Sequence, residues 1–340
     1  MARYDKPDER GNLLRALIYG PPKSQKTYFA MRMAEAGYNV ILADLDDGAA
    51  VGHRLSGAAK RRVFRLDMRP NGDSYGTSGA AALSYAMSGQ TVYFDEETRT
   101  YVPIQKIDPD KEYLRIALGK ATVRDVLVLD TWTAFVHQLT MNSVSVFSAL
   151  KVPKLEWDDY GAIRLILDHF LGGLTKLNCH TIVVAHSETY AKKKPDVDPK
   201  GKQVHEIIDS VRLQPSSVSR AHAETMAGKF TDVLYMENKG ATLGVRISTK
   251  GTVDFDAGSR YLAGADYKFD DVNSTVIMRP EHNALVAGHG DFDSEAVVVV
   301  NGADIIATRK DVSSGNAPGG TVEVSATPIV KRLSGLPKKS

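Results

Sequence analysis

Cysteine is almost absent from this sequence, and long apolar runs are absent altogether. Cys179 is the single cysteine in 340 residues, which excludes an intrachain disulfide and a metal site built from several cysteines. No stretch approaches the roughly 18 uninterrupted apolar residues of a membrane-spanning helix, and residues 1–12 are too polar for a secretory signal. We therefore expect a protein of the reducing cytoplasm.

An excess of charge of one sign is also missing. The 43 lysines and arginines nearly balance the 41 acidic residues, so the net charge is only +2 and the isoelectric point is near 8.4. Any contact with nucleic acid must therefore come from local basic patches and not from the field of the whole surface. The hydrophobic content of 43% is sufficient for a sizeable folded core.

The most informative segment runs from Ala16 to Thr27, where an apolar stretch leads into a lysine-threonine pair. A phosphate-binding loop of the Walker A type requires a first glycine, a second glycine before the lysine, and then lysine and serine or threonine. Gln25 replaces the second glycine, and the other three positions comply. The residues predicted to bind a nucleotide are Gly20, Pro21, Pro22, Lys23, Ser24, Gln25, Lys26 and Thr27.

The chemistry of such a loop gives its residues distinct roles. Backbone N–H groups of the loop and of the helix that follows it point at phosphate oxygens. Lys26 would reach the terminal phosphates, and Thr27 would bind Mg²⁺ through its hydroxyl. A side chain at Gln25 in a strained backbone conformation costs roughly 1–3 kcal/mol, enough to weaken nucleotide affinity about ten-fold. A chance strand-turn-helix with a lysine-threonine pair is the alternative interpretation.

Two further apolar segments end in acidic residues. Val126 to Asp130 has the Walker B pattern, in which a carboxylate at the end of a parallel strand supports Mg²⁺ beside the phosphate loop. Asn39 to Ala43 leads into the acidic run Asp44 to Asp47, and ATP hydrolysis needs a group that orients the attacking water. Asp130 is alternatively an aspartate that only caps the next turn, and the acidic run is alternatively a common acidic turn capped by Gly48.

The order of these motifs resembles the ATPase core of RecA and RadA, and phage-encoded AAA-type recombination and single-strand annealing ATPases most of all. The resemblance covers roughly residues 13–262 and includes the sequence TIVVAHSE, which ends at Glu188. It implies a three-layer α/β fold with a largely parallel sheet, and ATP and Mg²⁺ as ligands. It also implies that Asp46 activates water, that Asp130 supports the metal, and that His186 senses the nucleotide. A buried structural histidine is the alternative for His186.

The same resemblance suggests contacts with DNA and with a second subunit. Residues 188–220 lack periodicity and are predicted to form a mobile loop, which in RecA-like proteins contacts single-stranded DNA. Arg260 matches an arginine that reaches the nucleotide of a neighbouring subunit, although Gly258 replaces the lysine of that element. A solvated charge run and a surface arginine are the alternatives. The predicted DNA-binding residues are Lys192, Lys193, Lys194, Lys200 and Lys202.

The domain organisation follows from composition and turn signals. We expect an ATPase core over residues 1–263, in which residues 70–110 form an inserted β-hairpin. Residues 264–312 contain β-like runs, including Ser274 to Met278, and are expected to form a small β-rich extension. Residues 313–340 are rich in glycine, proline, serine and threonine, which is typical of a flexible tail.

The function expected from these features is Mg²⁺-dependent ATP hydrolysis on single-stranded DNA. The protein would assemble as a homo-oligomeric ring or filament and act with phage replication or recombination proteins in the cytoplasm of the infected cell. The alternative is a nucleotide-binding scaffold with poor hydrolysis, which Gln25 and Gly258 both favour. A small-molecule phosphotransferase fits less well, because no lid with clustered arginines is evident in the sequence.

Overall fold

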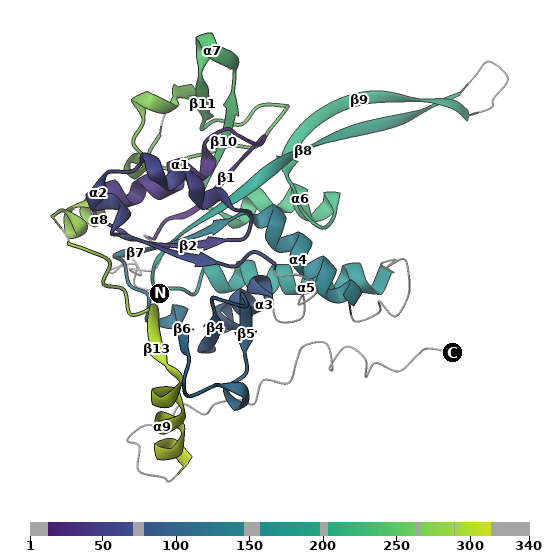
Figure 1. Cartoon of the computed structure of the whole chain (residues 1–340). Coiled ribbons are helices and arrows are strands. Elements are labelled where there is room, and N and C mark those ends of the chain that lie inside the picture. Colours follow the sequence, from purple (N-terminus) through teal and green to yellow (C-terminus); the bar gives the residue numbers. More distant parts are fainter. Residues whose placement is uncertain are drawn as a thin grey trace, which may run out of the picture.

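The central sheet consists of nine strands in the described part of the chain (Figure 1). The computed structural model describes residues 13–70, 78–145, 157–197, 203–262, 266–288 and 290–313. Neighbouring strands from β10 to β3 run parallel, and β11 and β12 extend the sheet antiparallel. In spatial order the strands are β12 (Asp266–Lys268), β11 (Val245–Ser248), β10 (Asp232–Asn238), β1 (Arg15–Gly20), β8 (His180–Val197), β7 (Asp125–Asp130), β2 (Asn39–Asp44) and β3 (Val63–Asp67), with β9 (Gln203–Pro215) paired to β8 off this path.

The central strands are buried along their whole length and mostly apolar, because both faces of the sheet are covered. Every residue of β1, β2 and β7 is buried. Successive side chains of a strand point to opposite faces, so Leu17 and Tyr19 enter one core cluster while Ala16 and Ile18 enter the other. Continuous apolar runs of this kind are typical of parallel strands between two helical layers.

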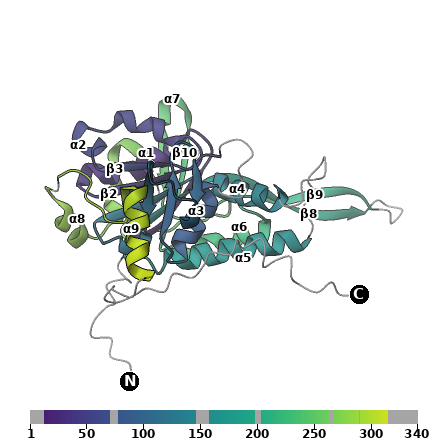
Figure 2. The same ribbon diagram turned by 60° about the horizontal axis from the view of Figure 1, so that its bottom comes forward.

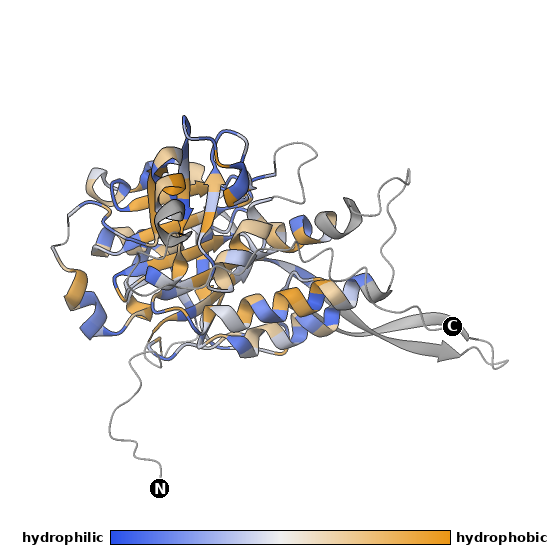
Figure 3. Cartoon of the chain, turned by 90° about the horizontal axis from the view of Figure 1, so that it is seen from below, coloured by the Kyte–Doolittle hydropathy of each residue, from blue (hydrophilic) through white to orange (hydrophobic). Residues whose placement is uncertain are grey.

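Helices cover both faces of the sheet and complete the three layers (Figures 1 and 2). None of those described is both long and apolar enough to cross a bilayer. The helices whose apolar residues pack on one face, with 3₁₀ helices labelled η, are α1 (Lys26–Met31), η2 (Arg32–Ala36), η3 (Gly48–Arg54), α2 (Gly57–Lys60), η8 (Phe269–Asp271), η9 (Ser274–Ile277) and α8 (Pro280–Val286). Those on the other face are α3 (Gly79–Met87), α4 (Trp132–Ser145), α5 (Trp157–Leu174), α6 (Arg220–Met226) and η7 (Ala227–Lys229). Figure 3 shows the resulting apolar interior between the layers.

A second, antiparallel sheet joins the inserted segment to the C-terminal segment. Its order is β13-β6-β4-β5, so the C-terminal strand pairs with a strand that follows the insertion. The expected hairpin is present as the β4–β5 pair. The elements of this region are β4 (Val92–Asp95), β5 (Thr100–Val102), η5 (Ile104–Lys106), β6 (Glu112–Ile116), η6 (Leu118–Lys120), β13 (Val297–Asn301) and α9 (Gly302–Ser313). The inserted segment and the C-terminal segment, which turn signals assign to separate units, therefore share one sheet.

The expectation of a mobile loop over residues 188–220 is wrong for the described residues. Strand β8 continues beyond the central sheet to Val197 and pairs antiparallel with β9 from Ser187↔Pro215 to Val197↔Gln203. Figure 1 shows this two-stranded arm leaving the body of the protein. Backbone hydrogen bonds hold the two strands of the arm together. Part of β8 reads Lys-Lys-Lys-Pro and has no alternation of apolar and polar residues, so the spacing of apolar residues does not predict a strand there.

The C-terminal extension also differs from expectation. The run that begins at Ser274 forms the helix η9 and not a strand. The side chain of Asn273 accepts a hydrogen bond from the Thr275 backbone N–H, which starts the helical turn, and Ile277 and Met278 are buried. The short helix α7 (Gly240–Leu243) connects β10 to β11.

We expect Gly302→Ala to destabilise the protein, because Gly302 begins α9 where the C-terminal segment meets the insertion. A Cβ atom at Gly302 would lie 1.9 Å from the backbone oxygen of Asp108, and overpacking of this kind costs about 1–3 kcal/mol. Thermal unfolding measures the effect as a Tm lowered by about 1–4 °C. Gly119→Ala is the matched control, since a Cβ there meets nothing within 4 Å. Equal Tm values for the two variants would contradict the described junction.

Candidate functional site

The carboxyl ends of four parallel strands bring the predicted site residues together. Gly20 at the end of β1 is in register with His186 on β8, and Asp44 at the end of β2 is in register with Asp130 on β7. Parallel strands place these ends at one edge of the sheet, where α/β proteins bind their ligands. Sequence motifs more than 100 residues apart thus meet at a single place.

The phosphate loop has the backbone that the altered motif predicts. Gly20 has φ 152° and approaches β10 so closely that a Cβ would lie 1.8 Å from the backbone oxygen of Met236. Gln25 adopts the left-handed conformation with φ 64° and ψ 19°, and Lys23 does so with φ 62°. The position that usually carries glycine therefore keeps the glycine conformation with a glutamine in it.

The ammonium group of Lys26 lies inside the loop. It donates hydrogen bonds to the backbone oxygens of Gly20 at 2.9 Å and Pro21 at 2.7 Å, and to the hydroxyl of Ser24 at 3.2 Å. Burial lowers the pKa of Lys26 to about 8, while the charges of Asp130 and Asp46 act in the opposite direction. The loop therefore holds a partly desolvated cation where anionic phosphates would bind.

The hydroxyl of Thr27 lies directly against the carboxylate of Asp130. Its Oγ1 is 3.0 Å from Oδ1 and 3.1 Å from Oδ2, and Asp130 is completely buried. Burial raises the pKa of Asp130 to about 7, and the neighbouring charges of Asp44 and Asp46 add to the rise. The hydrogen bond from Thr27 and the charge of Lys26 oppose it.

These two oxygen-bearing side chains fit Mg²⁺, which prefers hard oxygen ligands. Within the described ranges no three side chains among His, Cys, Asp and Glu gather as a dedicated metal cage. Thr27 and Asp130 would therefore supply a partial shell, completed by phosphate oxygens and water, as is usual for Mg²⁺ at phosphate sites.

Two arginines, one on β3 and one just after it, bind the carboxylates of Asp44 and Asp47. The buried carboxylate of Asp44 accepts from Arg65 Nε at 2.8 Å and from the Gly48 backbone N–H at 3.0 Å. Asp47 lies 3.1 Å from Arg65 and 2.7 Å from Arg69. The buried Asp44 therefore stabilises the backbone of the acidic turn through these hydrogen bonds.

Asp46 faces His186 instead. Its Oδ2 lies 3.3 Å from His186 Nε2, and its side chain remains 49% exposed. The backbone N–H of His186 donates to Thr133 at 3.0 Å, and its backbone oxygen accepts from Ser216 at 2.7 Å. The residues predicted as base and sensor are thus neighbours, at the point where β8 passes from the sheet into the arm.

Gly48, which follows the acidic run, was not among the predicted site residues, but it lies beside Asp130 and Thr27. A Cβ at this position would lie 1.8 Å from Asp130 Oδ2 and 3.2 Å from Thr27 Oγ1. The space beside the predicted metal ligands therefore depends on glycine. The only signal in the sequence was its position directly after the acids.

Arg260 does not lie at the phosphate loop of its own chain. It binds Asp232 through its Nε at 3.0 Å and its backbone N–H at 2.9 Å. Asp232 pairs with Ala16 near the start of β1, whereas the loop follows Gly20 at the end of that strand. Contact with a neighbouring subunit's nucleotide stays a prediction.

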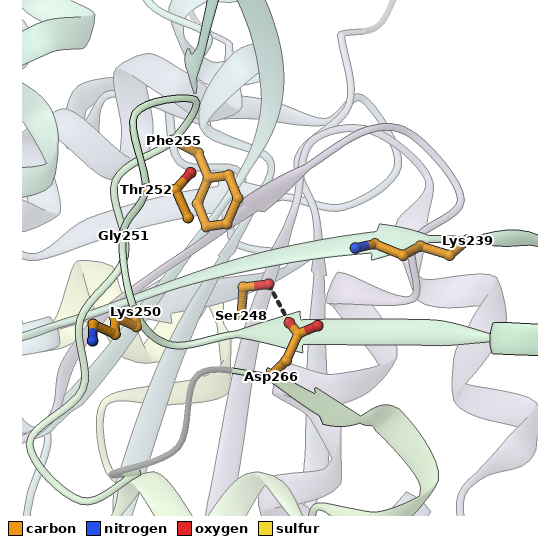
Figure 4. A pocket seen from close by; sticks show the side chains of 7 residues that line it. All are labelled: Lys239, Ser248, Lys250, Gly251, Thr252, Phe255 and Asp266. Carbon is orange, nitrogen blue, oxygen red and sulfur yellow. Dashed lines mark hydrogen bonds between the residues drawn. The ribbon is translucent and has the colours of Figure 1, made fainter.

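A cavity of about 370 Å³ lies along the antiparallel edge of the sheet (Figure 4). At its lining, Ser248 donates a 2.6 Å hydrogen bond to Asp266 on the neighbouring strand. Lys250, a cation ten residues before Arg260 in the sequence, is one of its lining residues. The full lining is Lys239, Ser248, Lys250, Gly251, Thr252, Phe255 and Asp266.

The predicted DNA-binding lysines belong to the arm. The backbones of Lys192, Lys193 and Lys194 are part of β8, and their side chains lie outside the described set. Lys200 and Lys202 fall wholly outside the described residues. Their contact with DNA stays a prediction.

The family of the chain is decided by a match over most of its length. The AAA domain family matches residues 12–265. The chain belongs to the AAA domain family. This AAA domain includes the phosphate loop, Asp46, Asp130, His186 and the arm, and the match together with the geometry supports a P-loop ATPase-type domain that binds ATP.

Similarity to other known proteins does not extend the AAA domain assignment. The structure matches 43 chains of solved structures. One is a prototypical ATPase from the type III secretion system of pathogenic bacteria, with 11% sequence identity and a TM-score of 0.33, over 68% of this chain and 54% of that one. The chain thus spans about half the length of that ATPase, and a likeness this weak carries no argument. No curated protein matches the sequence.

We expect Asp130→Asn to stabilise the metal-free and nucleotide-free protein at pH 8. The pKa of Asp130 rises from 3.8 unfolded to about 7 folded, so the folded state binds the proton more tightly and loses stability as the pH rises through this window. At 1.36 kcal/mol per pKa unit the loss is up to about 4 kcal/mol, or roughly 5 °C in Tm for a chain of this size. Thermal unfolding from pH 4 to pH 8 measures it.

In that series the difference in Tm between the variant and the wild type should shrink toward pH 4, where both carry a neutral side chain. Asp47→Asn is the control, because its carboxylate lies in the same turn with a largely exposed side chain. A Tm difference that does not change with pH would contradict the protonation assigned to Asp130.

Proposed function

We propose that the chain is an ATPase that hydrolyses ATP in response to single-stranded DNA. The observation that carries the proposal is the joint position of Lys26, Thr27, Asp130, Asp46 and His186 at one edge of the sheet. A phosphate loop alone binds nucleotides. A half-exposed carboxylate beside it, 3.3 Å from a histidine, adds a group that can orient water.

Each residue of this group has a part in the proposed reaction. Lys26 binds the terminal phosphates, and Thr27 and Asp130 hold Mg²⁺, which when bound neutralises charge on the phosphate oxygens. Asp46 accepts a hydrogen bond from the attacking water and orients it toward the terminal phosphorus. His186 helps to fix the position of the Asp46 carboxylate, because Nε2 of His186 lies 3.3 Å from Oδ2 of Asp46.

The arm is the proposed contact with single-stranded DNA. Lys192, Lys193 and Lys194 give β8 a run of three cations, which suits a phosphate backbone. The same strand carries His186, so DNA bound along the arm would contact an element that also contains a site residue. A solvated charge run is the alternative for these lysines.

Assembly and biological setting are part of the proposal as well. Arg260 or Lys250 of one subunit would approach the ATP of the next subunit in a ring or filament. We place this activity in phage recombination or replication, in the cytoplasm of the infected cell, on the resemblance to phage RecA-like ATPases.

A nucleotide-binding scaffold with little hydrolysis is the second candidate. The left-handed backbone of Gln25 favours it, because a non-glycine residue in that conformation stores strain within the phosphate loop. Such a protein would use ATP as a structural ligand and recruit partners through its oligomer or its second sheet.

Steady-state ATP hydrolysis with and without single-stranded DNA separates the two candidates. We expect DNA to stimulate hydrolysis, and Lys26→Ala to abolish both nucleotide binding and turnover because it removes the cation inside the loop. The activity of this variant also gives the contaminating background. Nucleotide binding by the wild type without turnover above that background would contradict the ATPase proposal and support the scaffold.

The arm is tested in the same assay with Lys192, Lys193 and Lys194 changed to glutamine. DNA affinity should fall, and the slope of log affinity against log salt should decrease by about 2, since each contact with a single-strand phosphate contributes about 0.7. The control removes the same charge from three exposed lysines of the body, Lys60, Lys106 and Lys176. Equal effects of the two triple variants would contradict DNA binding by the arm.

A further inference from the structure

The glutamine in the phosphate loop has a fixed partner outside the loop. Gln25 sits in the left-handed conformation with φ 64°, which a residue with a side chain adopts at a cost. Its side-chain oxygen Oε1 accepts a 2.8 Å hydrogen bond from Arg54 Nη1. A glycine, which the Walker A pattern has at this position, has no side chain and could not make this hydrogen bond. The contact with Arg54 therefore exists only because Gln25 replaces that glycine.

Arg54 is itself held in place on a second side. Its guanidinium lies 4.1 Å from the ring centroid of Tyr28, a favourable cation–π geometry. Tyr28 follows Thr27 on α1, and its ring packs 5.9 Å from that of Phe269, which is buried. Arg54 therefore bridges the loop residue Gln25 and the first turn of α1 from a supported position.

The segment that carries Arg54 also contacts the predicted metal ligands. Arg54 is the last residue of η3, and Gly48 is the first. Gly48 approaches Asp130 and Thr27 so closely that it has no room for a Cβ atom, and its N–H is bound by Asp44. This short helix thus spans from the acidic turn with Asp46 to the phosphate loop.

We propose that Arg54 is a positioning residue for nucleotide binding, which holds Gln25 in the left-handed conformation and so replaces the missing glycine of the loop. The proposal rests on nucleotide binding at the phosphate loop, as proposed above. It makes Gln25 and Arg54 a functional pair, and it removes the reason to regard Gln25 as a defect of the loop.

Binding of a fluorescent ATP analogue, with Mg²⁺, to a set of variants tests the pair. Arg54→Ala should weaken binding about ten-fold, the worth of a charge-assisted hydrogen bond at a partly exposed site. Gln25→Gly should bind within about two-fold of the wild type, because glycine needs no clamp. In the Gln25→Gly background, Arg54→Ala should then change the affinity less than about two-fold.

Two further variants isolate the hydrogen bond and the fold. Gln25→Met keeps a side chain of similar length without the acceptor oxygen, leaves the Arg54–Tyr28 contact intact, and should weaken binding as much as Arg54→Ala. Arg54→Lys retains a donor and a cation and should restore part of the affinity. Arg61→Ala removes a neighbouring exposed arginine that pairs with Asp291 and should leave the affinity unchanged.

Two outcomes would overturn the pairing. An equal loss from Arg54→Ala in the glutamine and glycine backgrounds would show that Arg54 acts without Gln25. Wild-type affinity of both Arg54→Ala and Gln25→Met would show that the contact has no role. Failure of nucleotide binding itself is distinguishable, because then the wild type and Lys26→Ala would give the same signal.

Discussion

The hydrogen bond between Thr27 and the buried carboxylate of Asp130 is the contact on which the site depends. The two residues belong to α1 and β7, and β8 lies between β7 and β1 in the sheet. They meet because the parallel strands end at one edge. The same constraint brings Asp46 to His186 and leaves Gly48 no room for a side chain. Burial disfavours the charged form of Asp130, and the hydrogen bond from Thr27 and the charge of Lys26 offset only part of this effect.

Much of this edge was predictable from local sequence signals. The apolar strands, the phosphate loop and the acid at the end of β7 each lie within a few consecutive residues. The same holds for α5, where Ile163, Leu167 and Phe170 recur at helical spacing and are all buried. Even the left-handed backbone at Gln25 follows from its place in a motif that calls for glycine there. Signals of this kind depend only on residues that lie close together in the sequence.

The remaining features depend on partners that are distant in the sequence. β6 pairs with β13 across about 180 residues, and no local pattern indicates it. The arm is a ladder of backbone hydrogen bonds over a stretch without apolar alternation, so periodicity suggested a loop. The contact between Arg54 and Gln25 is a side-chain hydrogen bond between two exposed segments, and composition gives no hint of it.

Isothermal titration calorimetry of MgATP binding, in buffers of different ionisation enthalpy, measures whether Asp130 loses a proton when Mg²⁺ binds. Burial raises the pKa of Asp130 to about 7, so its carboxyl is partly protonated near pH 7 and must lose that proton to hold Mg²⁺. We expect MgATP binding by the wild type to release a fraction of a proton per site at this pH, and Asp130→Asn to remove that release. Binding without proton release, or equal release from both proteins, would contradict the role of Asp130 in the metal site.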